Sequence, residues 1–405
     1  MARPRKSPPA FGPVTAADVI EFIETVCFVP EGKFVGQPLK LQEWQKDILR
    51  AIYDNPHGTR RAIISMGRKN AKTTLSACLL LAHLCGPPAR NRPNSELYSA
   101  AQSRDQAGII FSLAAKMVRL SPILARAVRI QETAQTLSCG ELGTRYRALS
   151  AEATTAFGLS PSLIIHDELG RVRGPRSPLY EALETAVGAQ EAPLSIVIST
   201  QAATDGDLLS ILIDDALRGC DPATVVRLYT APPELDPFSE EAIRAANPAL
   251  DAFMNKREVL AMANDAMRMP SRENEYRNLV LNQRVEASTT FLTAAAWRAC
   301  ADEPLDLAGL SVFAGLDLSE SADLTALVLA HCDPRDGVWH VRPIFWLPEE
   351  RLAEKAARDR APYDLWAEQG YLETTPGASI SYEFIAERLK DVFEEYHVTK
   401  IAFDR

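Results

Sequence analysis

Lys72 and Thr73 follow a short polar loop and open an apolar stretch, while the apolar run "RAIISM" before the loop predicts a strand. The loop consists of Gly67, Arg68, Lys69, Asn70 and Ala71. In a phosphate-binding loop, backbone N–H groups between strand and helix surround the anion, a lysine contacts the outer phosphates and the next hydroxyl binds magnesium. The order therefore predicts a nucleotide phosphate site. The alternative is a surface Lys-Thr pair at a helix start.

Both glycines of the usual G-x-x-x-x-G-K-[ST] pattern are absent, because Met66 and Ala71 occupy their positions. Alanine is the smallest side chain that could replace the second glycine. Gly67 lies one residue after the first position, so we expect it to supply backbone freedom. A partner acid must decide between the two interpretations.

Two acids end a second apolar run, "PSLIIHDELG", 95 residues downstream of Lys72. Asp167 at the strand end could hold magnesium through water, and Glu168 could polarise the attacking water, as in many phosphoryl-transfer ATPases. The alternative is a helix N-terminus, where the helix dipole favours acids. With the loop upstream, the catalytic interpretation is favoured.

Two further polar groups could complete the site. Ser199 and Thr200 end the run "LSIVISTQA" and could sense the γ-phosphate, although strands often end in such residues without a function. Gln45, in "LKLQEWQKDIL", could contact an adenine edge; the alternative is an amphipathic helix with Trp44 in the core.

Strand-like and helix-like runs alternate over about residues 60–230, which predicts an α/β domain with a mainly parallel sheet. The predicted strands are "RRAIISM", "SELYSA", "TRYRALS", "PSLIIHD", "LSIVIST" and "TVVRLYT". We expect an N-terminal tail and helix (1–40), an ATPase domain (41–285), a connection (286–309) and a second domain (310–405).

Composition narrows the class of protein. The net charge of −9 means that a nucleic-acid partner would need a local basic surface. Seven scattered cysteines form no C-x-x-C pair, which indicates neither a disulfide framework nor a zinc knuckle and favours a reducing cytosol. The apolar runs are too short or interrupted for a signal peptide or membrane span, so we expect no membrane partner.

Together these motifs resemble those of the large subunit of a tailed-phage terminase, the motor that packages and cuts viral DNA. The segments that carry the resemblance are "LQEWQKDIL", "MGRKNAKTT", "YSAAQSRDQA", "LIIHDE", "ISTQA", "GLDLSESADLTAL" and "IAFDR". Loops without a glycine before the lysine are typical of such motors. The resemblance implies that Lys72 binds the phosphates of ATP, that Thr73 binds Mg²⁺ and that Asp167 holds Mg²⁺ through water. It also implies that Glu168 is the catalytic base and that Arg68 acts in hydrolysis.

The second domain resembles an incomplete ribonuclease H-like nuclease, since three strands, helices and another strand follow one another. Asp317 lies on the first strand and Asp404 on the fourth. Parallel neighbouring strands would bring both carboxylates to one pair of Mg²⁺ or Mn²⁺ ions, and Asp323 could contribute from the hairpin. Each acid could instead be an ordinary turn or strand-end residue.

The chain ends at Arg405, whereas nucleases of this family continue through a segment with a further metal-binding acid. The resemblance therefore implies a truncated or partial reading frame, or a split gene. We expect ATPase competence together with weak or no nuclease activity.

The partners that the resemblance implies are double-stranded DNA, a portal protein, a small terminase subunit and further copies in a ring on the portal. The expected location is the cytoplasm of the bacterial host, outside the virion. Two alternatives remain open. A two-lobed DNA helicase or translocase would need a second ATPase-like lobe, and a non-catalytic DNA-binding assembly protein would bind ATP without DNA-stimulated turnover.

Overall fold

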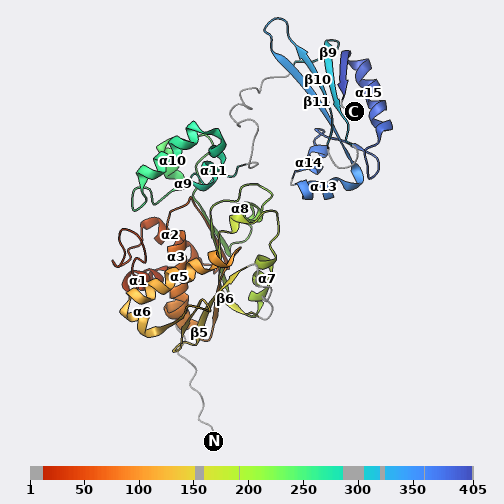
Figure 1. The fold of residues 1–405 in the computed structure, drawn as a ribbon. Helices are drawn as coiled ribbons and strands as arrows, with labels where there is room; N and C mark the ends of the chain where they lie inside the picture. Colours follow the sequence, from red (N-terminus) through yellow and green to blue (C-terminus); the bar gives the residue numbers. More distant parts are fainter. Residues whose placement is uncertain are drawn as a thin grey trace. The chain divides into compact units, whose positions relative to one another are not determined.

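The chain divides into two compact units, Met1–Phe291 and Leu292–Arg405, each with its own sheet (Figure 1). The computed structural model describes residues 12–150, 159–190, 192–285, 305–319, 324–359 and 361–403. Most of the predicted connection, residues 286–304, lies outside these ranges. Its boundaries therefore stay a prediction.

The first unit contains an eight-stranded sheet. Its strands are β1 (Arg61–Ser65), β2 (Glu96–Ala101), β3 (Val128–Gln131), β4 (Thr136–Cys139), β5 (Thr144–Ser150), β6 (Pro161–Asp167), β7 (Leu194–Ser199) and β8 (Thr224–Leu228). They lie in the order β3-β4-β5-β2-β6-β7-β1-β8, and all pairs from β5 to β8 are parallel. The predicted α/β class and all six predicted strands are confirmed.

The antiparallel hairpin β3-β4 was not predicted from the sequence. Each of its strands has only four residues, and a run of that length carries little periodicity.

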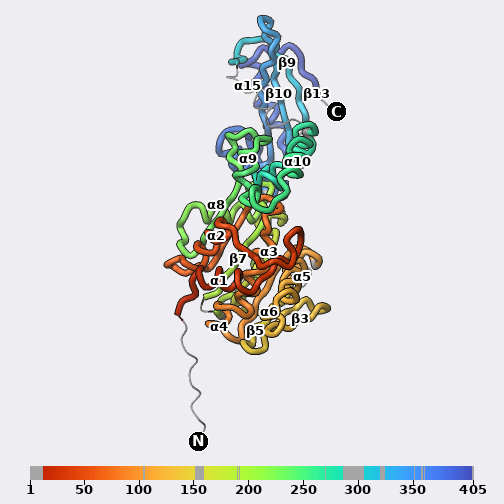
Figure 2. Tube along the Cα trace, turned by 90° about the vertical axis from the view of Figure 1, so that its left-hand side faces the viewer, coloured from red at the N-terminus to blue at the C-terminus, as the bar shows by residue number. Residues whose placement is uncertain are grey.

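Helices cover both faces of this sheet (Figures 1 and 2). The helices are α1 (Ala16–Val26), α2 (Glu43–Tyr53), α3 (Lys72–Cys85), α4 (Pro87–Asn91), α5 (Arg104–Leu120), α6 (Pro122–Ala127), α7 (Pro178–Ala186) and α8 (Leu208–Leu217). Successive residues of β1 point to opposite faces: Ile64 packs in the core with α1, α2, α3 and α5, whereas Ile63 packs with α7 and α8. Helix α3 is therefore central, and residues 75–84 are all buried.

Three helices follow β8: α9 (Glu240–Ala246), α10 (Lys256–Arg268) and α11 (Glu273–Leu279). We call residues 231–285 the α9–α11 segment. It has a small core of its own, which includes Ile243, Val259 and Tyr276. Its end returns to the main sheet, because the Val285 N–H donates to the Ala203 carbonyl oxygen (2.7 Å) just beyond β7.

The second unit contains a mixed sheet in the order β12-β11-β10-β9-β13. The strands are β9 (Ser311–Asp317), β10 (Thr325–Cys332), β11 (Trp339–Pro348), β12 (Glu373–Thr375) and β13 (His397–Phe403). Strands β9 and β13 are parallel neighbours, with Leu316 opposite Phe403, so their predicted adjacency is confirmed. The three-residue strand β12 was not predicted.

Helix α15 (Tyr382–Glu395) packs on one face of this sheet through Ile385 and Val392. The buried Trp346 belongs to the same core, and its indole N–H donates to Glu373 (2.7 Å). Two shorter helices, α13 (Leu352–Asp359) and α14 (Tyr363–Glu368), lie between β11 and β12 in the chain.

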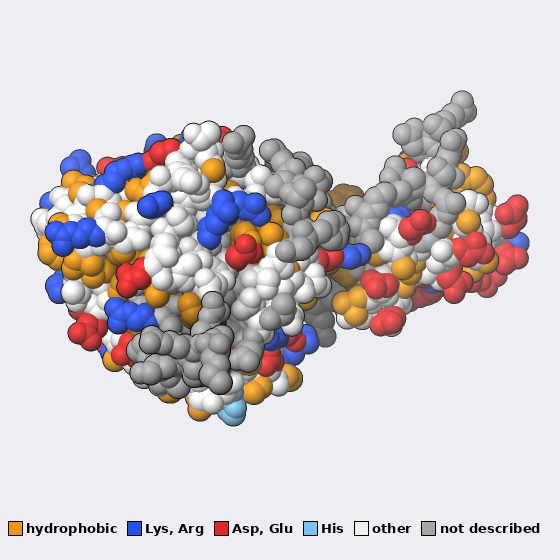
Figure 3. Space-filling view, turned by 90° about the horizontal axis from the view of Figure 1, so that it is seen from below, with side chains coloured by type: hydrophobic (Ala, Val, Ile, Leu, Met, Phe, Trp, Pro, Cys, Tyr) orange, Lys and Arg blue, Asp and Glu red, His pale blue; other side chains and the backbone are white. Residues whose placement is uncertain are grey.

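Acidic residues concentrate in the second unit. Residues 292–405 contain 21 Asp and Glu against 11 Lys and Arg, so this part of the chain accounts for the net negative charge. Figure 3 shows acidic side chains over much of the visible face of this unit. Among the residues that the structure describes, no helix has the length and apolar character needed to cross a membrane.

Candidate nucleotide site

The carboxyl ends of β6, β7 and β1 bring the predicted groups of the first unit to one edge of the sheet. Ser65 at the end of β1 lies opposite Ser199, and Asp167 lies opposite Ile198. The loop that follows β1 therefore begins two strands away from Asp167. In open parallel sheets, ligands bind at this edge.

The backbone amides of the loop and of the residues that flank it fall into two groups. Residues 66–68 donate to the carbonyl oxygens of Ser199, Ala246 and Leu279 at 3.2, 3.1 and 2.8 Å. The N–H groups of residues 69–74 find no acceptor in the described part of the chain. Six consecutive unpaired N–H groups that run into a helix N-terminus form a site suited to an anion.

Two non-glycine residues give the loop its shape. Lys69 (φ 69°) and Ala71 (φ 54°) occupy the left-handed region, at a cost of roughly 1–2 kcal/mol each. Gly67 does not, so the expectation that it supplies backbone freedom is wrong. A Cβ at position 67 would overlap the Asn247 side chain and the Val280 carbonyl oxygen. Glycine is needed there because the α9–α11 segment packs closely against the loop.

Lys72 is buried at the start of α3, and its ammonium donates to the carbonyl oxygens of Met66 (2.8 Å) and Gly67 (3.2 Å). Burial lowers the pKa of Lys72 to about 8. The negative charges of Glu168 and Asp167 oppose this shift, whereas the positive charge of Arg68 adds to it. Two cations, Lys72 and the half-buried Arg68, therefore lie at the loop.

Asp167 ends β6 and is 6% exposed. Its Oδ1 atom is buried and has no hydrogen-bond partner among the described residues. Burial raises the pKa of Asp167 to about 7; the adjacent Glu168 adds to this shift and Lys72 opposes it. A buried carboxylate oxygen without a partner, with the half-buried Thr73 hydroxyl on α3, fits the oxygen donors that Mg²⁺ prefers.

Glu168 adopts the left-handed conformation (φ 53°), and its N–H donates to the Ile198 carbonyl oxygen (2.9 Å). The Thr200 hydroxyl donates to Glu168 Oε2 (3.4 Å). By contrast, the Ser199 hydroxyl accepts from the Gly170 N–H (2.9 Å) and donates to the Thr200 carbonyl oxygen (2.6 Å). Of the two predicted γ-phosphate sensors, Thr200 thus contacts the acid, whereas Ser199 braces the turn after β6.

Gln45 lies in the first turn of α2, where its Oε1 accepts the Gln42 N–H (2.9 Å). The neighbouring Trp44 packs edge-on against Tyr229 (6.2 Å between ring centroids). Since the Tyr229 N–H donates to the Ser65 carbonyl oxygen (2.8 Å), the start of α2 lies near the end of β1. A contact between Gln45 and adenine stays a prediction.

Sequence reasoning missed the polar residues of the α9–α11 segment. The Asn282 Oδ1 atom accepts the Gln201 N–H (2.7 Å), and Arg284 donates to Gln201 Oε1 (3.1 Å) and to Asp214 (2.6 Å). Asn247 contacts the loop directly. The run "NQR" after the apolar end of α11 was the available signal, because consecutive polar residues beside buried ones need partners.

The second predicted site is described only in part. Asp317 is exposed at the end of β9, whereas Asp323 and Asp404 lie outside the described residues. Within the described ranges, no group of three or more His, Cys, Asp or Glu side chains could hold a metal ion. The roles of these acids therefore stay predictions.

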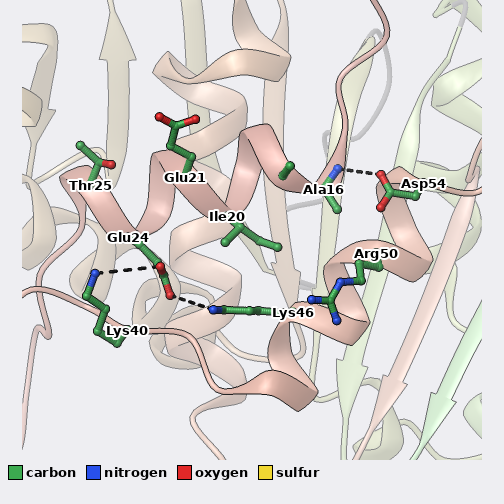
Figure 4. Close-up of a pocket in the computed structure, with 10 residues that line it drawn as sticks. Ala16, Ile20, Glu21, Glu24, Thr25, Lys40, Lys46, Arg50 and Asp54 are labelled. Atoms are coloured by element: carbon green, nitrogen blue, oxygen red, sulfur yellow. Dashed lines mark hydrogen bonds and ion pairs between the residues drawn. The ribbon is translucent and has the colours of Figure 1, made fainter.

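A separate pocket of about 520 Å³ lies between α1 and α2 (Figure 4). Within it Glu24 contacts Lys40 (4.0 Å) and Lys46 (3.5 Å), and Asp54 accepts the Ala16 N–H (2.8 Å). None of its lining residues belongs to the loop or to the strand ends described above. This pocket lies between two helices and is not part of the nucleotide site.

Comparison with known proteins identifies both parts of the chain. Residues 43–216 match the model of the terminase large subunit ATPase domain, and residues 224–405 match that of the terminase large subunit endonuclease domain. The second match begins at β8, so it includes the α9–α11 segment, which the structure places in the first unit.

The chain is also similar to individual proteins. The terminase large subunit of Enterobacteria phage HK97 is 49% identical over 387 residues, which cover 96% of this chain and 76% of that protein. The crystal structure of the HK97 large terminase superposes with a TM-score of 0.64 at 48% identity, covering 96% of this chain and 80% of the other. Protein YmfN of Escherichia coli K12 is 24% identical over 248 residues, or 58% of this chain and 54% of that protein.

Ala71→Gly should preserve ATP binding, because glycine adopts the left-handed conformation without penalty, whereas Ala71→Val should weaken it at least about 10-fold. Calorimetric titration with ATP and Mg²⁺ measures both dissociation constants. Equal affinities for the two variants would mean that the left-handed backbone at position 71 does not matter for binding.

Asp167→Asn should raise the melting temperature of the nucleotide-free first unit. The raised pKa means that ionised Asp167 destabilises the fold, by an amount that grows between pH 4 and 7 and is constant above. Each kcal/mol of destabilisation that the substitution removes should raise the melting temperature by about 2–4 °C. The gain should be larger at pH 8 than at pH 5.5 in thermal unfolding.

The control for this measurement is Asp215→Asn, which changes an exposed acid of α8. It should leave the melting temperature unchanged at both pH values. A gain for Asp167→Asn that is the same at both pH values would contradict the raised pKa of Asp167.

Proposed function

The chain belongs to the terminase large-subunit family, which combines a DNA-packaging ATPase with an endonuclease, and we propose that residues 66–73, Asp167 and Glu168 form its ATP site. The observation that carries the proposal is the run of unpaired N–H groups over residues 69–74. These dipoles, aided by the helix N-terminus, would bind the phosphates of ATP. The loop needs no glycine before Lys72 because Ala71 already adopts the required backbone.

Each charged group has a role that its surroundings support. Lys72, pre-oriented by two loop carbonyls, contacts the outer phosphates, and Arg68 adds positive charge at the transition state. Thr73 and Asp167 would hold Mg²⁺, which neutralises phosphate charge when bound. The unpaired Oδ1 of Asp167 is the observation that supports this ligand.

Glu168 is the proposed general base, which takes a proton from the attacking water. Its strained backbone fixes the carboxylate at the turn after β6, and the Thr200 hydroxyl orients Oε2. Strain of this kind persists only where surrounding contacts hold it, and it often marks functional residues. Thr200 would respond to the γ-phosphate through this contact, and Gln45 would read the adenine edge.

For the second unit we propose that Asp317, Asp323 and Asp404 hold the Mg²⁺ or Mn²⁺ ions of the endonuclease. The parallel pairing of β9 with β13 supports this assignment, because Leu316 lies opposite Phe403, the residue before Asp404. The proposed partners are double-stranded DNA, a portal protein, a small terminase subunit and further copies of this chain, in the cytoplasm of the bacterial host. The acidity of the second unit implies that divalent cations must offset its repulsion of DNA phosphates.

The two alternative functions fare differently. A two-lobed helicase requires a second ATPase-like lobe, whereas residues 224–405 match an endonuclease domain and the second unit has a five-stranded mixed sheet. A non-catalytic assembly protein would retain ATP binding without turnover. Substitution of Glu168 distinguishes a non-catalytic assembly protein from an ATPase in which Glu168 is the general base.

Glu168→Gln should lower the kcat of DNA-stimulated ATP hydrolysis by about 10²–10⁴-fold, the usual contribution of a general base, and leave the ATP dissociation constant within about 3-fold. Phosphate release and calorimetric titration measure the two quantities. Glu141→Gln, which alters an exposed glutamate between β4 and β5, should match the wild type. Unchanged hydrolysis in Glu168→Gln would exclude Glu168 as the base.

Asp317→Asn should abolish whatever cleavage of supercoiled plasmid the wild-type chain shows with Mn²⁺, since removal of a metal-binding carboxylate removes the bound ions. ATP hydrolysis should persist. Asp364→Asn, at an exposed acid of α14, is the control. Nicking that is measurable in the wild type and equally strong in Asp317→Asn would show that Asp317 holds no catalytic metal.

A further inference from the structure

The loop must be held in its shape by something other than glycine. Lys69 and Ala71 are both left-handed, so the loop carries strain on each side of Asn70. Such conformations persist when neighbouring contacts determine them. The contacts of Asn70 meet this requirement.

The Asn70 side chain is fully buried, and both its amide nitrogen and its amide oxygen are hydrogen-bonded. Its Nδ2 donates to the Gly67 carbonyl oxygen (2.9 Å) and to Asn247 Oδ1 (2.8 Å), and its Oδ1 accepts the Ala249 N–H (3.1 Å). The side chain therefore points away from the phosphate site and ties the loop to residues that follow α9.

Asn247 continues this chain of hydrogen bonds. It is 1% exposed, and its Nδ2 donates to the carbonyl oxygens of Ile243 and Val280, both at 2.8 Å. The same residue fills the space that the missing Cβ of Gly67 leaves. Its amide thus joins the end of α9, the end of α11 and the loop, although Asn70 lies 177 residues away in sequence.

We propose that Asn247 is a positioning residue of the ATPase, which acts through Asn70 to hold residues 69–71 in the backbone conformation that leaves their N–H groups open to phosphate. Glycines in a conventional loop reach left-handed conformations at no steric cost. Here the side-chain amide of Asn247 and the backbone N–H of Ala249, both in the α9–α11 segment, supply the constraint through Asn70. The inference rests on the proposed ATP site.

The first test is Asn247→Ala in the full chain. It removes one of the acceptors of Asn70 Nδ2 and should raise the dissociation constant and the KM for ATP about 10-fold, as expected for the loss of a buried hydrogen-bonding partner. Because the change acts on phosphate binding, kcat at saturating ATP should fall less than about 3-fold. Thermal unfolding of the first unit confirms that the variant is folded.

A rescue separates positioning from a merely structural role. If Asn247 offsets the strain at position 71, then Ala71→Gly should restore at least about 3-fold of the lost affinity in the Asn247→Ala background, because glycine carries no such strain. If Asn247→Ala only destabilised the α9–α11 segment, Ala71→Gly would not restore any ATP affinity. Full affinity in Asn247→Ala, or no rescue in the double variant, would overturn the proposal.

Two controls complete the design. Asn255→Ala removes the N-cap of α10, where Asn255 Oδ1 accepts the Glu258 N–H (3.4 Å), within the same segment but away from the loop. It should not change ATP affinity; a loss as large as that of Asn247→Ala would overturn the proposal. Lys72→Ala tests the ATP site itself: if it leaves binding unchanged, the proposed function fails, whereas loss of binding leaves the inference to be judged on Asn247.

Discussion

The site depends on one constraint: six consecutive backbone N–H groups, residues 69–74, must stay without a protein acceptor. The N–H groups of residues 71–74 are open because α3 begins there, whereas those of Lys69 and Asn70 depend on the conformation of the loop. Here the preceding amides, residues 66–68, bond outward to β7 and to the α9–α11 segment. With those three fixed and Asn70 held by Asn247, the next amides remain available to a ligand.

The buried charges of Lys72 and Asp167 also suit the binding of ATP and a divalent ion. Lys72 and Asp167 are both largely desolvated, and burial moves the pKa of each toward neutrality, lowering that of the lysine and raising that of the acid. An ATP phosphate would compensate the cation, and a divalent ion would compensate the acid. The two buried charges destabilise the fold, and a ligand that pairs with them would offset this cost, as is common at active sites.

Local sequence patterns predicted the strands of the ATPase sheet but not the Asn247 contacts that hold the loop. Alternating apolar runs predicted strand β6, which ends in Asp167, and strands β1 and β7, which precede Lys72 and Thr200, since periodicity and strand ends are visible in short windows. The role of Gly67 was misjudged because the atoms that it must avoid belong to Asn247 and Val280, far away in sequence. Short strands such as β12 and side-chain amides that act through tertiary contacts leave no periodic signal. In the second unit the pairing of β9 with β13 was expected from the resemblance to a ribonuclease H-like nuclease, because local periodicity predicts strands but not which strands pair.

Hydrogen exchange resolved to single amides tests the central claim most directly, on the full chain with and without ATP and Mg²⁺. The account predicts that Gly67 and Arg68 are protected in both states, because their N–H groups donate to Ala246 and Leu279. Residues 69–73 should exchange fast without nucleotide and slow at least about 10-fold when it binds. Rapid exchange of Gly67 and Arg68 in the free chain, or unchanged exchange of residues 69–73 with nucleotide, would contradict it.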